Sequence, residues 1–222
     1  EEVNRLNVFP VPDGDTGTNM SLTMRSVEDN LSALGSNLNK ESVCRAITTG
    51  ALMGARGNSG VITSQILRGI CEGIKKCDEL TSESIAFVFD SAEDVAYSAV
   101  RKPVKGTILT VLSDIAQAAR ASRDAGLSVE KTLTGLVEAG YESVKTTPEY
   151  LPVLKENNVV DAGGYGFSIL LDGFVTSFLE KGEELSLKFD ASKMSAPKVE
   201  IEQINDWEGS KYRYCNEFLV DS

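Results

Sequence analysis

Residues 59–76 read SGVITSQILRGICEGIKK, and their apolar side chains recur every three or four residues, as on one face of an α-helix. The apolar positions are Val61, Ile62, Ile66, Leu67, Ile70 and Ile74. Further segments of helical length, rich in Ala, Leu and Ser, cover residues 19–34, 41–53, 82–100, 107–122, 128–146 and 163–179. Gly or Pro separates them, for example at Gly35, Pro103, Gly126 and Pro148. The sequence therefore predicts an all-α fold of about seven helices.

Short connections and broad apolar faces favour antiparallel packing in a bundle or a helical barrel. We expect this helical domain to cover residues 1–185. From residue 186 the composition shifts to Lys, Glu and scattered polar residues, and Tyr212, Tyr214, Asn216 and Phe218 alternate with other residues as in a strand. Residues 186–222 are therefore predicted to be a linker and the start of a truncated second domain with a short β-type tail. The chain begins at Glu1 without Met, so we expect a fragment of something longer.

The composition excludes several classes of chemistry. The 222 residues include 33 acidic and 22 basic side chains, a net charge of −11, and no histidine. A Ser–His–Asp or Cys–His relay and a histidine-ligated zinc are thus excluded, and the acidic balance argues against a nucleic-acid surface. The four cysteines form no C-x-x-C pair, and we expect them to be reduced. No apolar run of the roughly 18–20 residues that span a bilayer is evident, so a soluble, cytoplasmic protein without membrane insertion is predicted.

The first candidate site is the polar stretch 7–19, NVFPVPDGDTGTN, which directly precedes a predicted helix. Asp13 and Asp15 stand two residues apart, and glycines alternate with hydroxyls after them. Carboxylates are suitable ligands for Mg²⁺, and free N–H groups at a helix start are suitable donors to phosphate. The alternative is an Asp/Gly/Pro turn in which Thr16 or Thr18 caps the helix.

Three further glycine-bearing segments also precede predicted helices. In residues 54–60, GARGNSG, Arg56 could offer its planar fork to phosphate, with Asn58 or Ser59 adding a hydrogen bond. Residues 159–166, VVDAGGYG, place Asp161 before three glycines, and residues 102–107, KPVKGT, place a Lys and a hydroxyl at a helix start. A tight helix–helix turn, an ion pair of Arg56 or a simple N-cap at Asp161 would explain each segment separately. Four such helix starts together favour a pocket for an anion with its Mg²⁺.

In these segments the chain resembles the L-subunit-type nucleotide-binding domain of the dihydroxyacetone kinases. It is most similar to the N-terminal domain of the bacterial fatty acid kinase A subunits. The resemblance implies an antiparallel eight-helix barrel that closes over ADP or ATP and two Mg²⁺ ions.

The site residues follow from the resemblance. The three metal-binding positions would be Asn7, Asp13 and Asp15, although dihydroxyacetone kinases carry Asp where Asn7 stands. The nucleotide would contact residues from all four segments: Thr16, Gly17, Thr18, Asn19, Asn58, Ser59, Gly60, Thr107, Ile108, Asp161, Ala162 and Gly163. Sugar-kinase members place an Arg near residues 146–149, where this chain has none, and Arg56 is our candidate for that charge.

The resemblance also implies phosphoryl transfer from ATP, with the acceptor held elsewhere. In fatty acid kinases the acceptor is an acyl carboxylate, presented by a separate fatty-acid-binding protein of the DegV type, and a carboxylate needs no general base. A homodimer formed through regions outside this chain is a further expectation. Two alternatives stay open: the L component of a dihydroxyacetone (glycerone) kinase, and a regulatory nucleotide-binding module without catalysis.

Overall fold

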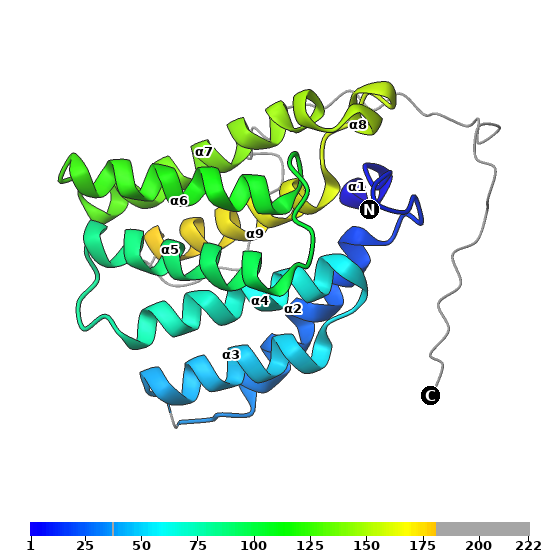
Figure 1. Cartoon of the computed structure of the whole chain (residues 1–222). Coiled ribbons are helices and arrows are strands. Elements are labelled where there is room, and N and C mark those ends of the chain that lie inside the picture. The colour runs from blue at the N-terminus through cyan, green and yellow to red at the C-terminus, as the bar shows by residue number, and fades with distance from the viewer. Residues whose placement is uncertain (37, 181–222) are drawn as a thin grey trace.

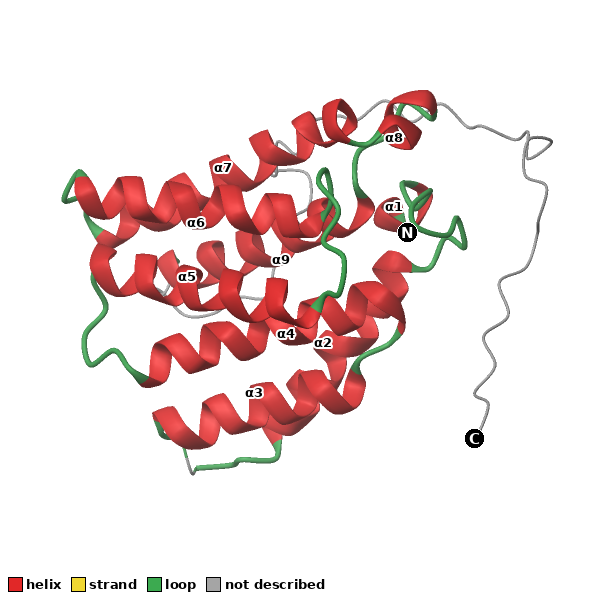
Figure 2. Cartoon of the chain, in the orientation of Figure 1, coloured by secondary structure: helices red, strands yellow, loops and turns green. Residues whose placement is uncertain are grey.

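The structure, a computed structural model, describes residues 1–36 and 38–180, and all secondary structure within these ranges is helical (Figure 2). The helices of this part are α1 (Glu2–Arg5), α2 (Thr16–Ser32), α3 (Lys40–Gly54), α4 (Gly57–Lys75), α5 (Ser82–Ala99), α6 (Ile108–Asp124), α7 (Val129–Tyr150), α8 (Pro152–Glu156) and α9 (Ala162–Leu179). The all-α prediction is confirmed for these residues, and each of the seven long helices corresponds to a predicted segment. The predicted linker and β-type tail at 186–222 lie outside the described residues.

Local capping signals set several helix starts. The side chain of Thr81 accepts a hydrogen bond from the Ser84 N–H, and Ser84 bonds back to Thr81, which forms a capping box at α5. Ser128 caps α7 in a similar way by accepting from the N–H of Lys131. Helix α2 begins three residues before the predicted start, at Thr16, because the polar residues 16–18 continue the helix without contributing to its apolar face.

Helix α7 corrects one predicted boundary. Pro148 was expected to separate two helices, but α7 runs through it to Tyr150. A proline leaves the carbonyl four residues earlier without its usual N–H donor. The hydroxyl of Thr147 donates to that carbonyl, the O of Val144, at 2.7 Å. A side chain thus replaces the lost backbone hydrogen bond.

The long helices run antiparallel, each packed on the next from α2 to α7 (Figure 1). Helix α9 packs against α7, α6 and α2, and the short α1 lies on α2 and α9. Because successive helices alternate in direction, α2, α4, α6 and α9 all begin at the same end, on the right in Figure 1. This end of the domain contains all four glycine-bearing segments.

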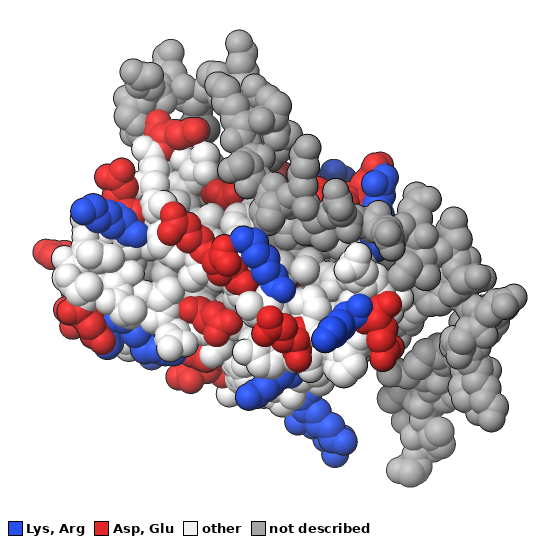
Figure 3. All heavy atoms as spheres, turned by 90° about the horizontal axis from the view of Figure 1, so that it is seen from above, with Lys and Arg blue, Asp and Glu red and all other residues white. Residues whose placement is uncertain are grey.

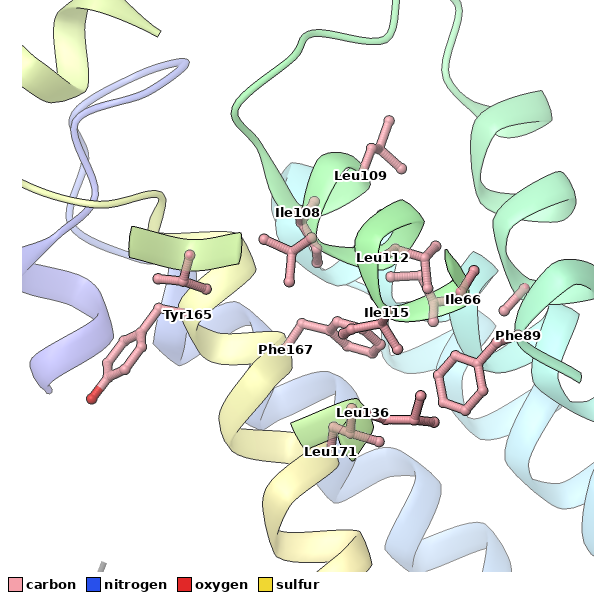
Figure 4. Packing of buried hydrophobic residues seen from close by; sticks show 14 of the residues in the cluster. Ile66, Phe89, Ile108, Leu109, Leu112, Ile115, Leu136, Tyr165, Phe167 and Leu171 are labelled. Atoms are coloured by element: carbon pink, nitrogen blue, oxygen red, sulfur yellow. The ribbon is translucent and has the colours of Figure 1, made fainter. Parts of the chain in front are cut away.

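One hydrophobic cluster joins the helices, and Figure 4 shows side chains from α4, α5, α6, α7 and α9 gathered in it. Ile66, Leu112, Ile115 and Leu136 are completely buried there. At the surface, Arg120 of α6 bridges Asp90 and Glu93 of α5 at 2.5 and 3.2 Å. Acidic and basic side chains are intermixed on the face shown in Figure 3.

Helix α9 departs from one expectation. Its residues 162–179 are long and apolar enough to cross a membrane by length and composition, although no such run was recognised in the sequence. In the structure 44% of this segment is buried inside the domain, and the Asp172 carboxylate within it accepts a hydrogen bond from the Tyr141 hydroxyl of α7. Core helices of globular proteins meet the same criteria, so this property is weak evidence for a membrane span.

Candidate functional site

The loop between α1 and α2 is organised around the side chain of Asn7, which is only 6% exposed. Its Nδ2 donates to Asp13 Oδ1 at 2.6 Å and to the Val11 carbonyl at 3.0 Å. Its Oδ1 accepts a hydrogen bond from the Thr16 hydroxyl. Asn7 and Asp13, two of the three predicted metal-binding residues, are therefore in direct contact.

Asp15 occupies the N-cap position of α2, but its side chain makes no capping hydrogen bond. The carboxylate of Asp13 is exposed, and that of Asp15 is partly exposed. Among the described residues, the N–H groups of Thr16 and Gly17 have no hydrogen-bond acceptor, as is usual in the first turn of a helix. Two carboxylates and two free donors thus lie together where α2 begins. The alternative in which Thr16 or Thr18 caps α2 does not occur.

The short helix α1 covers the other side of this turn. Asn4 Oδ1 accepts from the Thr18 N–H at 3.1 Å, and Asn4 Nδ2 donates to the Thr18 hydroxyl at 2.9 Å. The N–H of Thr18 therefore has an acceptor, whereas its hydroxyl accepts from Asn4 and keeps its own hydrogen free to donate. Nothing in the local sequence marks Asn4 for this role, because its partner lies fourteen residues away.

The start of α4 lies directly beside the start of α2. Gly57 has a φ of +57°, and a β-carbon on it would stand 2.4 Å from Asn19 Nδ2, so the turn requires glycine on both counts. Ser59 Oγ contacts the Thr16 carbonyl at 3.4 Å, and Gly60 packs against Thr23. The structure therefore brings the first two candidate segments together, with Asn58 exposed at their edge.

Arg56 is exposed, and its guanidinium donates to the carbonyls of Met53 and Ala55 at 3.2 and 2.8 Å. It thus covers carbonyl groups at the end of α3 instead of pairing with a carboxylate. Both acceptors are neutral carbonyls, so a phosphate could compete for the guanidinium.

Asp161 joins the starts of α6 and α9. Its side chain is 5% exposed and caps α9 by accepting from the Gly164 N–H at 2.7 Å. Burial raises the pKa of its carboxyl to about 6, and hydrogen bonds from the N–H groups of Gly164 and Ile108 oppose that rise. Its own N–H donates to the Thr147 hydroxyl at 3.0 Å. Asp161 is therefore an N-cap, as the simpler interpretation proposed, and it also bonds to α6.

The glycines that follow Asp161 contact other helices closely. A β-carbon on Gly164 would stand 2.7 Å from Val111 of α6, and one on Gly166 would stand 2.7 Å from the sulfur of Met20 of α2. Ala162 and Ile108 are buried, whereas Thr107 and Gly163 are partly exposed. Helix packing explains Gly164 and Gly166, and Gly163 is the glycine at this start that keeps some exposed surface.

The two pairs of helix starts are connected through α9, which contacts both α6 and α2. Among residues 1–36 and 38–180, no three Cys, Asp or Glu side chains are grouped to hold a metal ion. Asp13 and Asp15 alone fit a hard cation whose remaining ligands are water and phosphate oxygens, which is the usual coordination of Mg²⁺ beside a nucleotide. The described residues thus form an all-helical domain in which two carboxylates and four helix starts share one end.

Comparison with known proteins assigns this chain to a family. The DAK2 domain family matches residues 10–176, and the chain belongs to it. This confirms the resemblance to the dihydroxyacetone kinase L-subunit type. The family is associated with kinase-type phosphoryl transfer, and this domain is its nucleotide-binding part.

Relatives of the whole chain occur in staphylococci. An uncharacterized protein of Staphylococcus epidermidis (strain ATCC 12228 / FDA PCI 1200) is 43% identical over 98% of this chain. Another, from Staphylococcus aureus (strain USA300), is 42% identical over the same share. The chain spans 40% of the length of each relative.

Proposed function

We propose that this domain binds ATP with Mg²⁺ and supplies the phosphoryl group in a kinase reaction. The observation that carries the proposal is the arrangement at the start of α2, where Asp13 and Asp15 lie beside the free N–H groups of Thr16 and Gly17. The matching start of α4 adds Asn58, Ser59 and Gly60. The family membership and the common end of α2, α4, α6 and α9 support it further.

In this proposal Asp13 and Asp15 would hold Mg²⁺, which neutralises phosphate charge when bound. The N–H groups at the starts of α2 and α4 would orient the phosphates. The starts of α6 and α9 would border the rest of the nucleotide, at Thr107, Ile108, Ala162 and Gly163. Asp161 is buried and would contribute indirectly, by fixing the starts of α6 and α9 relative to each other. Thr18, Asn19 and Gly17 would contact the nucleotide as predicted, and Thr18 would also support the turn through Asn4.

We further propose that the helices close an antiparallel barrel of the L-subunit type. The contacts of α2 with α9, together with the succession of contacts from α2 to α7 and α9, support this closure. The nucleotide would bind at the end of the barrel where these helices begin.

For the acceptor, we propose a fatty acid carboxylate held by a separate acyl-binding protein, giving acyl phosphate and ADP in the cytoplasm. A carboxylate is already deprotonated and needs no general base, and the chain contains no histidine to act as one. A sugar hydroxyl, as in glycerone kinases, would need a base from another subunit. Because the chain covers 40% of its relatives, the acceptor-binding part would lie elsewhere.

Calorimetric titration with ATP tests the donor proposal. Micromolar binding in Mg²⁺ should disappear when the metal is chelated, and Asp13→Ala and Asp15→Ala should each abolish it. Asp124→Ala, the same charge change at the exposed far end of α6, is the matched control and should bind normally. Equal affinity with and without Mg²⁺, or normal binding by both site variants, would refute the metal assignment.

The acceptor is tested separately by measuring ADP release in two reactions, with hydroxylamine trapping used to identify acyl phosphate in the first. Reactions would contain ATP, Mg²⁺ and either a fatty-acid-loaded carrier protein or dihydroxyacetone with its binding subunit. Product only in the second reaction would overturn the fatty acid proposal and leave the donor site intact.

A further inference from the structure

The side chain of Asn7 uses both of its donors within the loop before α2, and its oxygen accepts one hydrogen bond from the start of α2. Its amide nitrogen donates to Asp13 Oδ1 and to the Val11 carbonyl, and its oxygen accepts from the Thr16 hydroxyl. With 6% of the residue exposed, little of it faces solvent.

The chemistry of the partners fixes which way the amide points. A carboxylate and a backbone carbonyl only accept hydrogen bonds, so the atom 2.6 Å from Asp13 and 3.0 Å from Val11 must be the NH₂ group. The opposite orientation would set an oxygen against two acceptors. The Asn7 oxygen is therefore directed at Thr16, in the first turn of α2.

The Asn7 NH₂ group carries partial positive charge and lies between two oxygens, one of a carboxylate and one of a carbonyl. It therefore reduces the repulsion between these oxygens, as a bound cation would. We infer that Asn7 is a positioning residue and not a metal ligand: its NH₂ group takes the place of a cation between Asp13 and Val11. Through its two ends it fixes Asp13 relative to Thr16 before any metal arrives. Asp13 and Asp15 then remain the two side chains that bind Mg²⁺, a role that rests on the proposed function.

The isosteric substitution Asn7→Asp tests this inference. It replaces the NH₂ group with a second carboxylate oxygen about 2.6 Å from Asp13, which is repulsive without a cation between them. We expect the melting temperature of the full chain in chelator to fall by about 5 °C. Millimolar Mg²⁺ alone, without nucleotide, should restore most of this loss and should raise the wild-type melting temperature by much less.

Asn4→Asp is the matched control, with the same charge change on the neighbouring helix α1. The partner of its amide nitrogen is the Thr18 hydroxyl, which can reverse and donate to a carboxylate. Its melting temperature should therefore show no response to Mg²⁺. The double variant Asn7→Asp/Asp13→Asn removes the pair of facing carboxylates but still sets a carboxylate oxygen against the Val11 carbonyl. It should therefore regain part of the lost stability in chelator and lose the Mg²⁺ response.

Two results would overturn the inference: an Asn7→Asp variant as stable as wild type in chelator, or a double variant as unstable as the single one. Folding of Asn7→Asp only in the presence of Mg²⁺ would support it. These measurements use Mg²⁺ alone, so absence of ATP binding would refute the proposed function without affecting them.

Discussion

Removal of the Asp161 carboxylate should destabilise the domain, because N–H groups at the starts of α6 and α9 would lose their acceptor. The side chain is 5% exposed and accepts from the N–H groups of Gly164 and Ile108. In Asp161→Ala both donors are left buried without an acceptor, at roughly 1–3 kcal/mol each. We expect urea unfolding at pH 7 to show a loss of about 2–4 kcal/mol, allowing for partial relaxation.

The same residue gives the domain a defined pH dependence. Burial raises the pKa of the folded carboxyl from 3.8 to about 6. Between these values the folded state binds a proton that the unfolded state has released, so stability falls as the pH rises, and above about 6 it stays constant. A shift of about two pKa units corresponds to about 3 kcal/mol.

The assay compares wild type with Asp161→Asn, which has no charge to lose at this position. The free energy of unfolding of wild type, measured relative to Asp161→Asn, should decrease by up to about 3 kcal/mol between pH 4 and pH 6.5. A difference that stays constant, or that increases with pH, would refute the assignment of a raised pKa to the folded state.

Three other substitutions test the packing and the proline segment. Gly50→Ala should lower stability by about 1–3 kcal/mol in thermal unfolding, because its β-carbon would stand 2.7 Å from the backbone oxygen of Ser26. Gly135→Ala, where nothing lies within 4 Å, should instead gain about 0.5–1 kcal/mol, and a gain at both sites would contradict the close α2–α3 contact. Thr147→Val should cost about 1–3 kcal/mol in urea unfolding, because it removes the donor to the Val144 carbonyl and the acceptor of the Asp161 N–H. Unchanged stability would contradict a stabilising role for these two hydrogen bonds of the fully buried Thr147.

The long helices could be predicted from sequence because their apolar faces repeat at the helical period, as in residues 59–76. The first turn of α2 could not, since residues 16–18 carry no apolar pattern and only the fold shows that they are helical. The predicted helix end before Pro148 was wrong because the Thr147 hydroxyl replaces the hydrogen bond that the proline removes. A hydroxyl residue directly before a proline can therefore indicate that a helix continues through it. The short helices α1 and α8 have too few residues for any periodicity.

The candidate site was predicted in part. The motifs correctly indicated four helix starts, and the alternating directions of the helices bring them to one end. Asp161 was predicted as an N-cap, but its contact with Ile108 depends on how α6 and α9 meet. The contacts of Asn7 and Asn4 likewise depend on the folded loop, and residue type alone does not reveal whether an amide serves as a ligand or as a support.

The central claim is that nucleotide binds where α2, α4, α6 and α9 begin. The most direct test is to record backbone amide NMR spectra of the chain during titration with ATP and Mg²⁺. Binding at this end should shift the amide signals of Asp15–Gly17, Asn58–Gly60, Thr107–Ile108 and Ala162–Gly163 most strongly. Shifts concentrated instead at the opposite end, in the cavity of about 360 Å³ lined by Lys76, Thr81 and Arg123, would contradict it.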